Sequence, residues 1–390
     1  MFDVTSSFIY ECQERTMTPY RKFTIGGSDY SDLVETWPQI KRGSAVLKAG
    51  TLDVSLANPD GAMNEFYKGQ YKLKDKIKFI IGADSSETID LYTGEINKII
   101  YENNLCIIKA RDKLWDFSQR ILGDGINPVL IPPTSQYLIS DIAWTICTCY
   151  GGLDSTQGSN NVDIDYESFE AFAEQFSIDN VYGQTRYAGV KAIKALSDLA
   201  HMSDSAIWIE GDGKLVFKRF SEAGSSDIAM SGEHFSDLKI SIDMDRMINK
   251  QWVYFDYAVE SRYWVGNVFE IQSTSVETFG LHENVLKNQN IWYVDSISAL
   301  NVAVRKSVIM HSPNKKFSFI TGMNGIQTQI GDTVRLVEDF YDLTSGQGWT
   351  VEGVEYNMAT MKNKFLLDEA FVVDAFYLDV STLDGDHLLL

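Results

Sequence analysis

The sequence predicts an α+β chain in which two β-rich blocks flank helix-bearing segments. Strand-like patterns fill 46–122 and return over 313–370, where short apolar runs alternate with polar residues and turns. Between these blocks, apolar residues recur at helical spacing over 190–199 and 296–310. A chain of 390 residues exceeds one ordinary hydrophobic core, so we expect two to four domains.

The composition is that of a globular protein, with 44% hydrophobic and 12% aromatic residues and only 7 prolines. Fifty-four acidic residues against 34 basic ones give a net charge of −20, which argues against a protein that grips nucleic acid. The first residues lack the basic and apolar regions of a signal peptide, and no apolar run approaches 18 residues. We therefore expect folding in a cytoplasm, where cysteines stay reduced.

The first β block is expected to follow an extended arm, residues 1–20, and a short strand that ends at Gly26-Gly27. The segment 46–57 alternates apolar and polar side chains and stops at a turn, Asn58-Pro59-Asp60-Gly61. Pro59 presets φ for that turn, and Gly61 supplies a positive φ. Three further segments predict two strands, then a strand followed by a short charged helix: KDKIKFIIG, IDLYTGEINKIIYENN and LCIIKARDKLWDFSQRIL.

A domain boundary is predicted in 123–135, where Gly and Pro concentrate and Pro132-Pro133 cannot continue a strand ladder. Beyond it, Ser140-Asp141 open an amphipathic helix that Gly151-Gly152 stop. Its apolar positions are Ile142, Ala143, Ile146 and Cys149.

A second helix is predicted immediately before a β-hairpin. The helix carries one apolar stripe, Val190, Ile193, Ala195, Leu196 and Leu199. The hairpin follows in AIWIEGDGKLVFKRF, where Gly211-Asp212-Gly213 separate two alternating strands.

The pattern is β again over 238–280, and Gly280 ends it. A helix follows in SISALNVAVRKSVIMHS, with Ser296 or Ser298 as its N-cap and Pro313 just beyond its end. Strands then fill FSFITGM, DTVRLVEDF and GWTVEGVEYNMATMKNKFLL. The two β blocks suggest a pseudo-repeat from pattern alone, because no strict sequence repeat is present. Residues 366–390 carry six acids and no Lys or Arg.

Cysteines and loop acids are the metal-ligand candidates. Cys147 and Cys149 are spaced too closely for a structural metal pair and would face different directions on a helix. The four cysteines, Cys12, Cys106, Cys147 and Cys149, are therefore interpreted as buried structural thiols. A loop brings together Asp154, Asn160, Asp163 and Asp165, but their order does not match a calcium loop. Turn formation and helix capping explain these residues equally well, so we expect no metal and no cofactor.

Alternating lysines would share one face of a strand: Lys72, Lys74, Lys76 and Lys78. Three interpretations stay open. The row is a solvated face that protects a sheet edge, an interface with an acidic neighbouring subunit, or a stripe that contacts DNA. The acidic balance of the chain disfavours the last of these.

No catalytic motif is visible. The five histidines are scattered, and neither H-E-x-x-H, G-x-S-x-G nor G-x-x-x-x-G-K-[ST] occurs. With 54 acids, a pair of carboxylates suited to glycan cleavage carries no information. The aromatic group of the third β segment is expected in core and interface rather than in a sugar platform: Tyr254, Phe255, Tyr257, Tyr263, Trp264 and Phe269.

The run GTLDVSLANPDGAMN, LYTGEINKI and IIKARDKLWDF resembles the N-terminal barrel of tailed-bacteriophage hub proteins, also called baseplate or tail-tip hubs. The helix-then-hairpin unit at 190–220 and the segment 296–360 are similar to later regions of that family. The resemblance implies a non-enzymatic trimer with two β-barrel-like, tail-tube-like domains per copy. It implies five parts: 1–125 as arm and first barrel, 126–237 as an α/β domain, 238–260 with 313–370 as second barrel, 261–312 as an inserted strand-helix domain, and 371–390 as an acidic tail.

The same resemblance implies a place at the distal end of the tail of a virion assembled in the host bacterial cytoplasm. The implied partners are the distal tail protein, the tail tube, the tape measure and tip or fibre proteins, with DNA only in transit during ejection and no stable membrane association. Two alternatives remain. One is the distal tail adaptor ring, and the other is a tip protein that binds glycan or degrades peptidoglycan.

Overall fold

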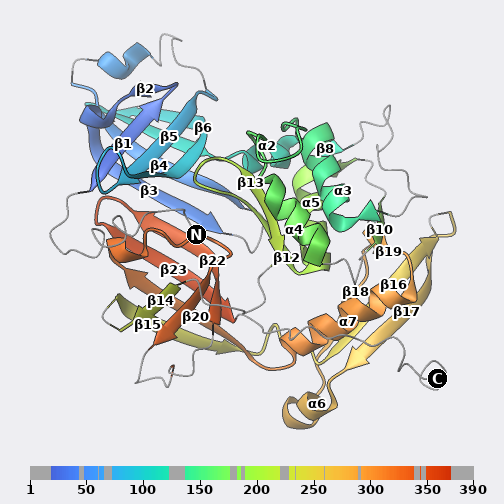
Figure 1. The fold of residues 1–390 in the computed structure, drawn as a ribbon. Helices are drawn as coiled ribbons and strands as arrows, with labels where there is room; N and C mark the ends of the chain where they lie inside the picture. The colour runs from blue at the N-terminus through green and yellow to red at the C-terminus, as the bar shows by residue number, and fades with distance from the viewer. Residues whose placement is uncertain are drawn as a thin grey trace.

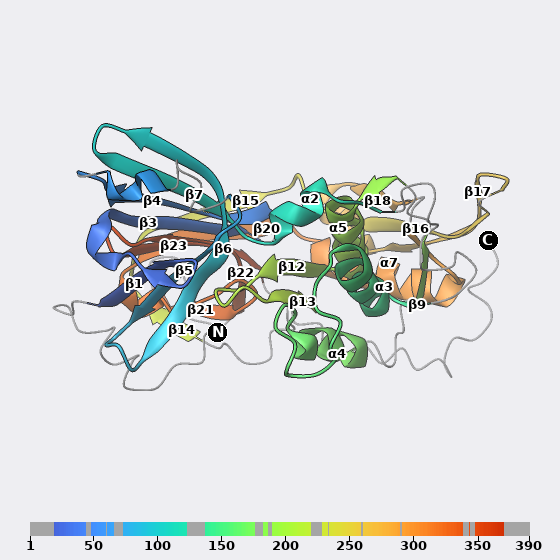
Figure 2. The ribbon, with the colours of Figure 1, turned by 90° about the horizontal axis from the view of Figure 1, so that it is seen from above.

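The computed structural model describes residues 19–43, 48–59, 61–65, 73–122, 137–175, 182–185, 189–219, 228–232, 234–258, 260–288, 291–337, 343 and 348–369. Its strands form a 13-stranded sheet, a six-stranded sheet and two pairs of strands. Figures 1 and 2 show the large sheet at one end of the molecule, a helical region beside it, and the six-stranded sheet with its long helix at the other end.

The large sheet combines strands from both ends of the chain. Its N-terminal strands are β1 (Tyr20–Ile25), β2 (Ser28–Asp29), β3 (Val34–Gly43), β4 (Lys48–Ala57), β5 (Lys76–Gly82), β6 (Thr88–Glu102) and β7 (Leu105–Arg111). Its later strands are β14 (Ile228–Ser231), β15 (Phe235–Asp243), β20 (Asn314–Thr321), β21 (Thr333–Val337), β22 (Gly348–Asn357) and β23 (Lys362–Glu369). Short 3-10 turns lie at Ser31–Leu33, Ala62–Glu65 and Met323–Gly325.

The two β blocks are joined edge to edge by β3 and β22. These strands pair antiparallel, with Ile40 opposite Tyr356 and Gly43 opposite Gly353. The strand order runs β15-β20-β23-β22-β3-β4-β7-β6-β5-β1-β2, with β21 and β14 branching from β22. The prediction of a chain rich in strands with helices between two β blocks is confirmed. The described strands form an open path and not two closed barrels. The edge of β3 that could have closed the first block instead pairs with β22 of the other block.

Local sequence explains the strands of the first block. Leu52, Val54 and Leu56 are buried on one side of β4, as their alternation predicts. The turn after this strand is the predicted one, since Gly61 has φ +68. Gly26 and Gly27 also have positive φ at the end of β1, where the sequence predicts a stop. The arm up to Thr18 lies outside the described residues.

The helical region holds α2 (Leu114–Gln119), β8 (Ile121–Leu122), β9 (Tyr137–Leu138), α3 (Ile139–Thr145), α4 (Tyr166–Gln175), β10 (Tyr182–Thr185), β11 (Val190–Lys191), α5 (Ala192–Ser203), β12 (Ser205–Ile209) and β13 (Leu215–Arg219). The predicted hairpin is β12 with β13, and Gly213 has φ +94 in its turn. The predicted boundary at Pro132-Pro133 lies outside the described residues.

Two helical predictions need correction. The helix α3 continues as a π-helix, Ile146–Tyr150, in which the Gly151 amide donates to the Ile146 carbonyl at 2.8 Å. The wider turn shifts the helix face, so Cys149 is exposed instead of continuing the apolar stripe. Val190 belongs to β11 and not to the predicted helix, because it pairs with Leu122.

The third region holds β16 (Lys250–Ala258), β17 (Tyr263–Ile271), α6 (Ser273–Phe279), β18 (Glu283–Leu286), β19 (Ile291–Tyr293) and α7 (Ser296–Met310). The helix α6 interrupts a segment that we predicted to be β throughout, and Gly280 ends it with φ +82. The predicted N-cap of α7, Ser296 or Ser298, is also wrong, whereas Pro313 does stand just beyond the end of the helix. Asp295 is the N-cap, and its carboxylate accepts from the Ser298 amide at 2.7 Å. Asp has the better geometry because it stands one residue before the first helical turn.

Candidate assembly surfaces

The lysine row is spread over a turn and a strand. Lys72 lies outside the described residues, and Lys74 stands in the turn before β5 with φ 85. Lys76 and Lys78 share one side of β5, opposite the buried Ile77 and Phe79.

Two of the three described lysines of the row have an acidic partner within the same chain. Lys78 pairs with Asp90 at 2.6 Å, and Lys74 lies 3.7 Å from Asp116. Both pairs are partly exposed to solvent, so each contributes little to the stability of the single chain. Its use as an interface stays a prediction.

The interpretation as buried thiols holds for Cys106 and Cys147 and is wrong for Cys149, which is exposed. Cys106 and Cys147 are buried and free, and burial raises the pKa of Cys106 to about 11. Burial also raises the pKa of Cys147. Cys147 and Cys149 point in different directions, one buried and one exposed, whereas Cys12 lies outside the described residues.

The acidic loop is held by turn chemistry. Asp154 accepts from the amide and the hydroxyl of Thr156 at 3.0 and 2.8 Å, and Asp163 accepts from the Asp154 amide at 3.0 Å. Asn161 donates to the carbonyls of Asp154 and Thr156. Across the described residues, no group of three or more His, Cys, Asp or Glu side chains is arranged to hold a metal ion.

An exposed apolar surface covers one side of the sheet formed by β17, β16 and β18. On the other side, α7 packs over Val253, which is fully buried with Ala299 and Val302. Cross-strand neighbours lie on the same side of a sheet, and the register places Trp252 opposite both Phe269 and Val285. We call this surface the outer face, and define it as Lys250, Trp252, Tyr254, Tyr263, Val265, Phe269, Ile271 and Val285.

The apolar side chains of the outer face are large and open to solvent. Phe269 is 46% exposed, Val285 is 52% exposed, and Tyr263 and Val265 are each 55% exposed. Clustered exposure of this kind marks an interaction surface, whereas scattered apolar residues do not. The sequence pointed to this aromatic group without showing which members are exposed. Phe255 packs toward the core under α7, while Tyr263 and Phe269 face outward.

Cations lie against the aromatic rings of the outer face. The Lys250 ammonium is 4.7 Å from the Trp252 ring centre and also pairs with Glu283 at 2.7 Å. The Lys287 ammonium is 4.7 Å from the Tyr254 ring centre. Within the described part of the chain, Lys287 has no carboxylate partner. The outer face therefore offers apolar area together with positive charge.

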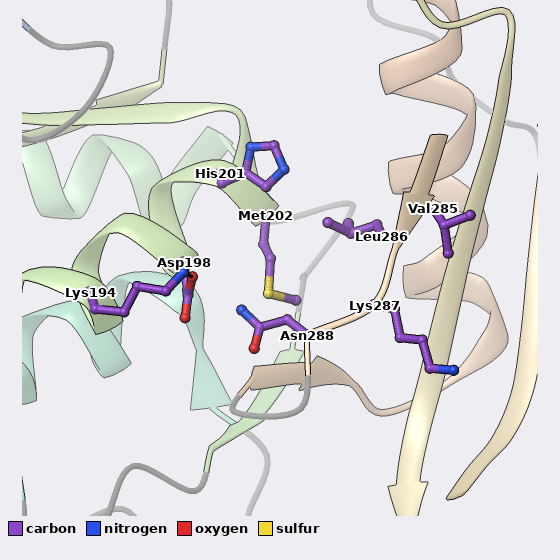
Figure 3. A pocket seen from close by; sticks show the side chains of 8 residues that line it. All are labelled: Lys194, Asp198, His201, Met202, Val285, Leu286, Lys287 and Asn288. Carbon is purple, nitrogen blue, oxygen red and sulfur yellow. Dashed lines mark hydrogen bonds and ion pairs between the residues drawn. The ribbon is translucent and has the colours of Figure 1, made fainter. Parts of the chain in front are cut away.

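A cavity of about 440 Å³ adjoins the outer face, between α5 and β18 (Figure 3). Val285 and Lys287 line it from β18 and the residues after it, and Asp198 lines it from α5. Asp198 is 6% exposed; one carboxylate oxygen binds Lys194, and the other has no hydrogen-bond donor among the described residues. His201 also lines the cavity, and burial and the nearby Lys306 lower its pKa.

Comparisons with known proteins were informative only at the level of structure. No family model matches the chain, and no curated protein matches it. Among solved structures, it is similar to the 43 kDa tail protein of prophage MuSo2 from Shewanella oneidensis, with 14% identity and a TM-score of 0.53 over 90% of this chain and 98% of that one. The chain has the fold of a prophage tail protein.

Two further tail proteins share this fold over nearly their whole length. The tail protein from Neisseria meningitidis MC58 is 13% identical, with a TM-score of 0.55 over 90% of this chain and 96% of that one. The prophage tail protein gp18 from Listeria monocytogenes EGD-e is 11% identical, with a TM-score of 0.55 over 89% of this chain and 94% of that one. Among the described helices, none has the length and apolar character needed to span a membrane.

Proposed function

We propose that this chain is a structural protein of a bacteriophage tail, and specifically the hub that joins the six-fold tail tube to the tip or baseplate. The observation that supports the proposal is the fold shared with three tail proteins, two of them from prophages, over 89–90% of the chain. The likeness includes both β blocks and the helical region between them, so it is not limited to one common domain.

The junction of β3 with β22 supports a hub role. It hydrogen-bonds two strand blocks into one sheet, and Ile40 and Tyr356 are fully buried at the join. The blocks therefore keep a fixed relative position. Three copies, each contributing two blocks, would present six similar units to a six-fold tube, which is the arrangement that the family resemblance implies.

The charge of the chain fits a channel through which DNA passes. A net charge of −20 repels phosphate, and salt limits that repulsion to about 8 Å at physiological ionic strength. Lys78 is paired with Asp90 and Lys74 lies near Asp116, which reduces their attraction for DNA. We propose that the lysine row lies at an outer surface or a subunit boundary, and that the chain has no enzymatic activity.

The proposed partners are further copies of this chain, the distal tail protein, the tail tube, the tape measure and tip or fibre proteins. The assembled protein would reside at the tail tip of a virion built in the host cytoplasm. Its interfaces are expected to be permanent ones, which typically bury about 2,000 Å² or more in total.

Stoichiometry and position in the particle test the proposal. Native mass spectrometry of purified tails, with immunogold labelling, should find three copies at the distal end. Six or twelve copies would replace the hub by the distal adaptor ring. Degradation of peptidoglycan by the purified chain, abolished by one carboxylate substitution, would instead support the enzymatic tip protein.

A further inference from the structure

We propose that residues 370–390, the acidic segment, bind the outer face of the same molecule. The segment would cover the exposed apolar side chains of β16, β17 and β18 and place its carboxylates beside Lys250 and Lys287. This inference concerns a contact within the chain and is independent of the proposed tail function.

The chemistry of the segment complements that of the outer face. The segment has no Lys or Arg and contains four aspartates: Asp374, Asp379, Asp384 and Asp386. Apolar residues fill most of the positions between them, including Phe371, Phe376, Tyr377, Leu378 and Leu383. A segment that combines apolar and acidic groups matches a surface that combines apolar area with ammonium groups.

The last described strand ends near the outer face. Asp368 in β23 lies opposite Lys316 in β20, and β20 begins at Asn314, shortly after α7 ends. The Ile248 amide donates to the Met310 carbonyl at 2.7 Å, which holds the start of β16 against the end of α7. The chain therefore leaves the large sheet close to the edge of the outer face that contains Lys250.

The segment is long enough to follow the whole surface. An extended chain covers at most about 3.3–3.6 Å per residue, so 21 residues reach roughly 70 Å. The nine residues of β17 span about 30 Å at the usual rise of a strand. A contact within one molecule also needs no partner concentration, because the short connection keeps the segment close to its target.

Cross-linking of the full-length protein tests the contact. A carbodiimide joins amines to carboxylates without a spacer, and the products are identified by mass spectrometry. We expect links from Lys287 and Lys250 to aspartates of the segment. The experiment uses an equal mixture of ¹⁴N- and ¹⁵N-labelled protein combined before assembly, so links within one chain carry a single isotope.

Matched variants separate this contact from unspecific proximity. Phe269→Asp should lower the yield of these links at least about tenfold, a loss equivalent to about 1.4 kcal/mol of contact free energy. Ile242→Asp, an exposed apolar position on β15, should leave the yield unchanged. Phe376→Asp alters only the segment, so it remains informative if Phe269→Asp fails to fold.

Three results would overturn the proposal. Links of mixed isotope would show that a second copy supplies the segment. Links from the segment to other lysines, with none to Lys287 or Lys250, would place it elsewhere. Unchanged yields in both Phe269→Asp and Phe376→Asp would show that the apolar face does not hold it.

Discussion

Asp204 is the group on which the attachment of α7 to α5 depends most. It ends α5 in the left-handed region, with φ 50 and ψ 45. Its carboxylate binds the Arg305 guanidinium at 3.0 Å and also the Lys306 ammonium. Both cations are buried in α7, with side chains only 8% and 4% exposed. Removal of this carboxylate would leave two buried cations without their main counter-charge.

The expected cost of Asp204→Asn is large for a single substitution. Breaking a buried ion pair by removing one partner typically costs about 3–5 kcal/mol, and the partial exposure of Asp204 places this case near the lower value. Asn tolerates the left-handed conformation, so this variant isolates the charge. Asp204→Ala should cost roughly 1 kcal/mol more, because alanine is strained at positive φ. Asp295→Ala, which removes only the N-cap of α7, should cost about 1 kcal/mol.

The pH dependence gives a second measure of the same contact. Burial alone raises the pKa of Asp204, but Lys306 and Arg305 outweigh it and hold the pKa at about 2. A depressed carboxyl pKa stabilises the fold above about pH 4, and this stabilisation is lost as pH falls toward 2. The difference between wild type and Asp204→Asn should therefore shrink over that interval.

Urea denaturation followed by circular dichroism, with hydrogen exchange in α7, measures these effects. Hydrogen exchange is needed because a chain of several parts need not unfold in one step. The reasoning is refuted if Asp204→Asn is within about 0.5 kcal/mol of wild type at neutral pH, the range typical of a surface substitution. It is also refuted if Asp295→Ala is the more damaging change.

Three further predictions concern a turn, a buried acid and the lysine row. Gly61→Val should lower the free energy of unfolding by about 1–2 kcal/mol, because φ is +68 and a Cβ would lie 2.6 Å from the side-chain amide nitrogen of Asn64. An unchanged melting temperature together with normal incorporation into tails would contradict this prediction. Burial and the adjacent Asp368 raise the pKa of Glu352 to about 7, so its contribution to stability falls as pH rises from about 4.5 to 7. Glu352→Gln should therefore gain in melting temperature relative to wild type over that interval, and a constant difference would refute the assignment. Replacing the whole lysine row with Glu should impair assembly or solubility more than DNA ejection. Assembled mutant tails with selectively slow ejection would contradict this prediction. The row consists of Lys72, Lys74, Lys76 and Lys78.

Local patterns in the sequence predicted local structure well. The alternation in β4, the turn at Gly61 and the hairpin around Gly213 each depend on residues within a few positions of one another. The errors arose where local preferences alone do not distinguish between neighbouring residues. The π-turn at Ile146 and the cap at Asp295 were missed because several neighbouring residues have similar preferences, and packing selects among them.

The sequence by itself determined the position of most strands and helices, although not of α6, together with the acidic balance and the aromatic richness of 250–271. Tertiary structure alone decided that β3 pairs with β22, because these strands are more than 300 residues apart and either could have paired within its own block. It also decided which side of β16 and β17 faces solvent, since both sides carry large apolar residues and only the docking of α7 covers one of them. The outer face and the Asp204 contact both depend on where distant elements meet, and the pattern of a single segment does not record that position.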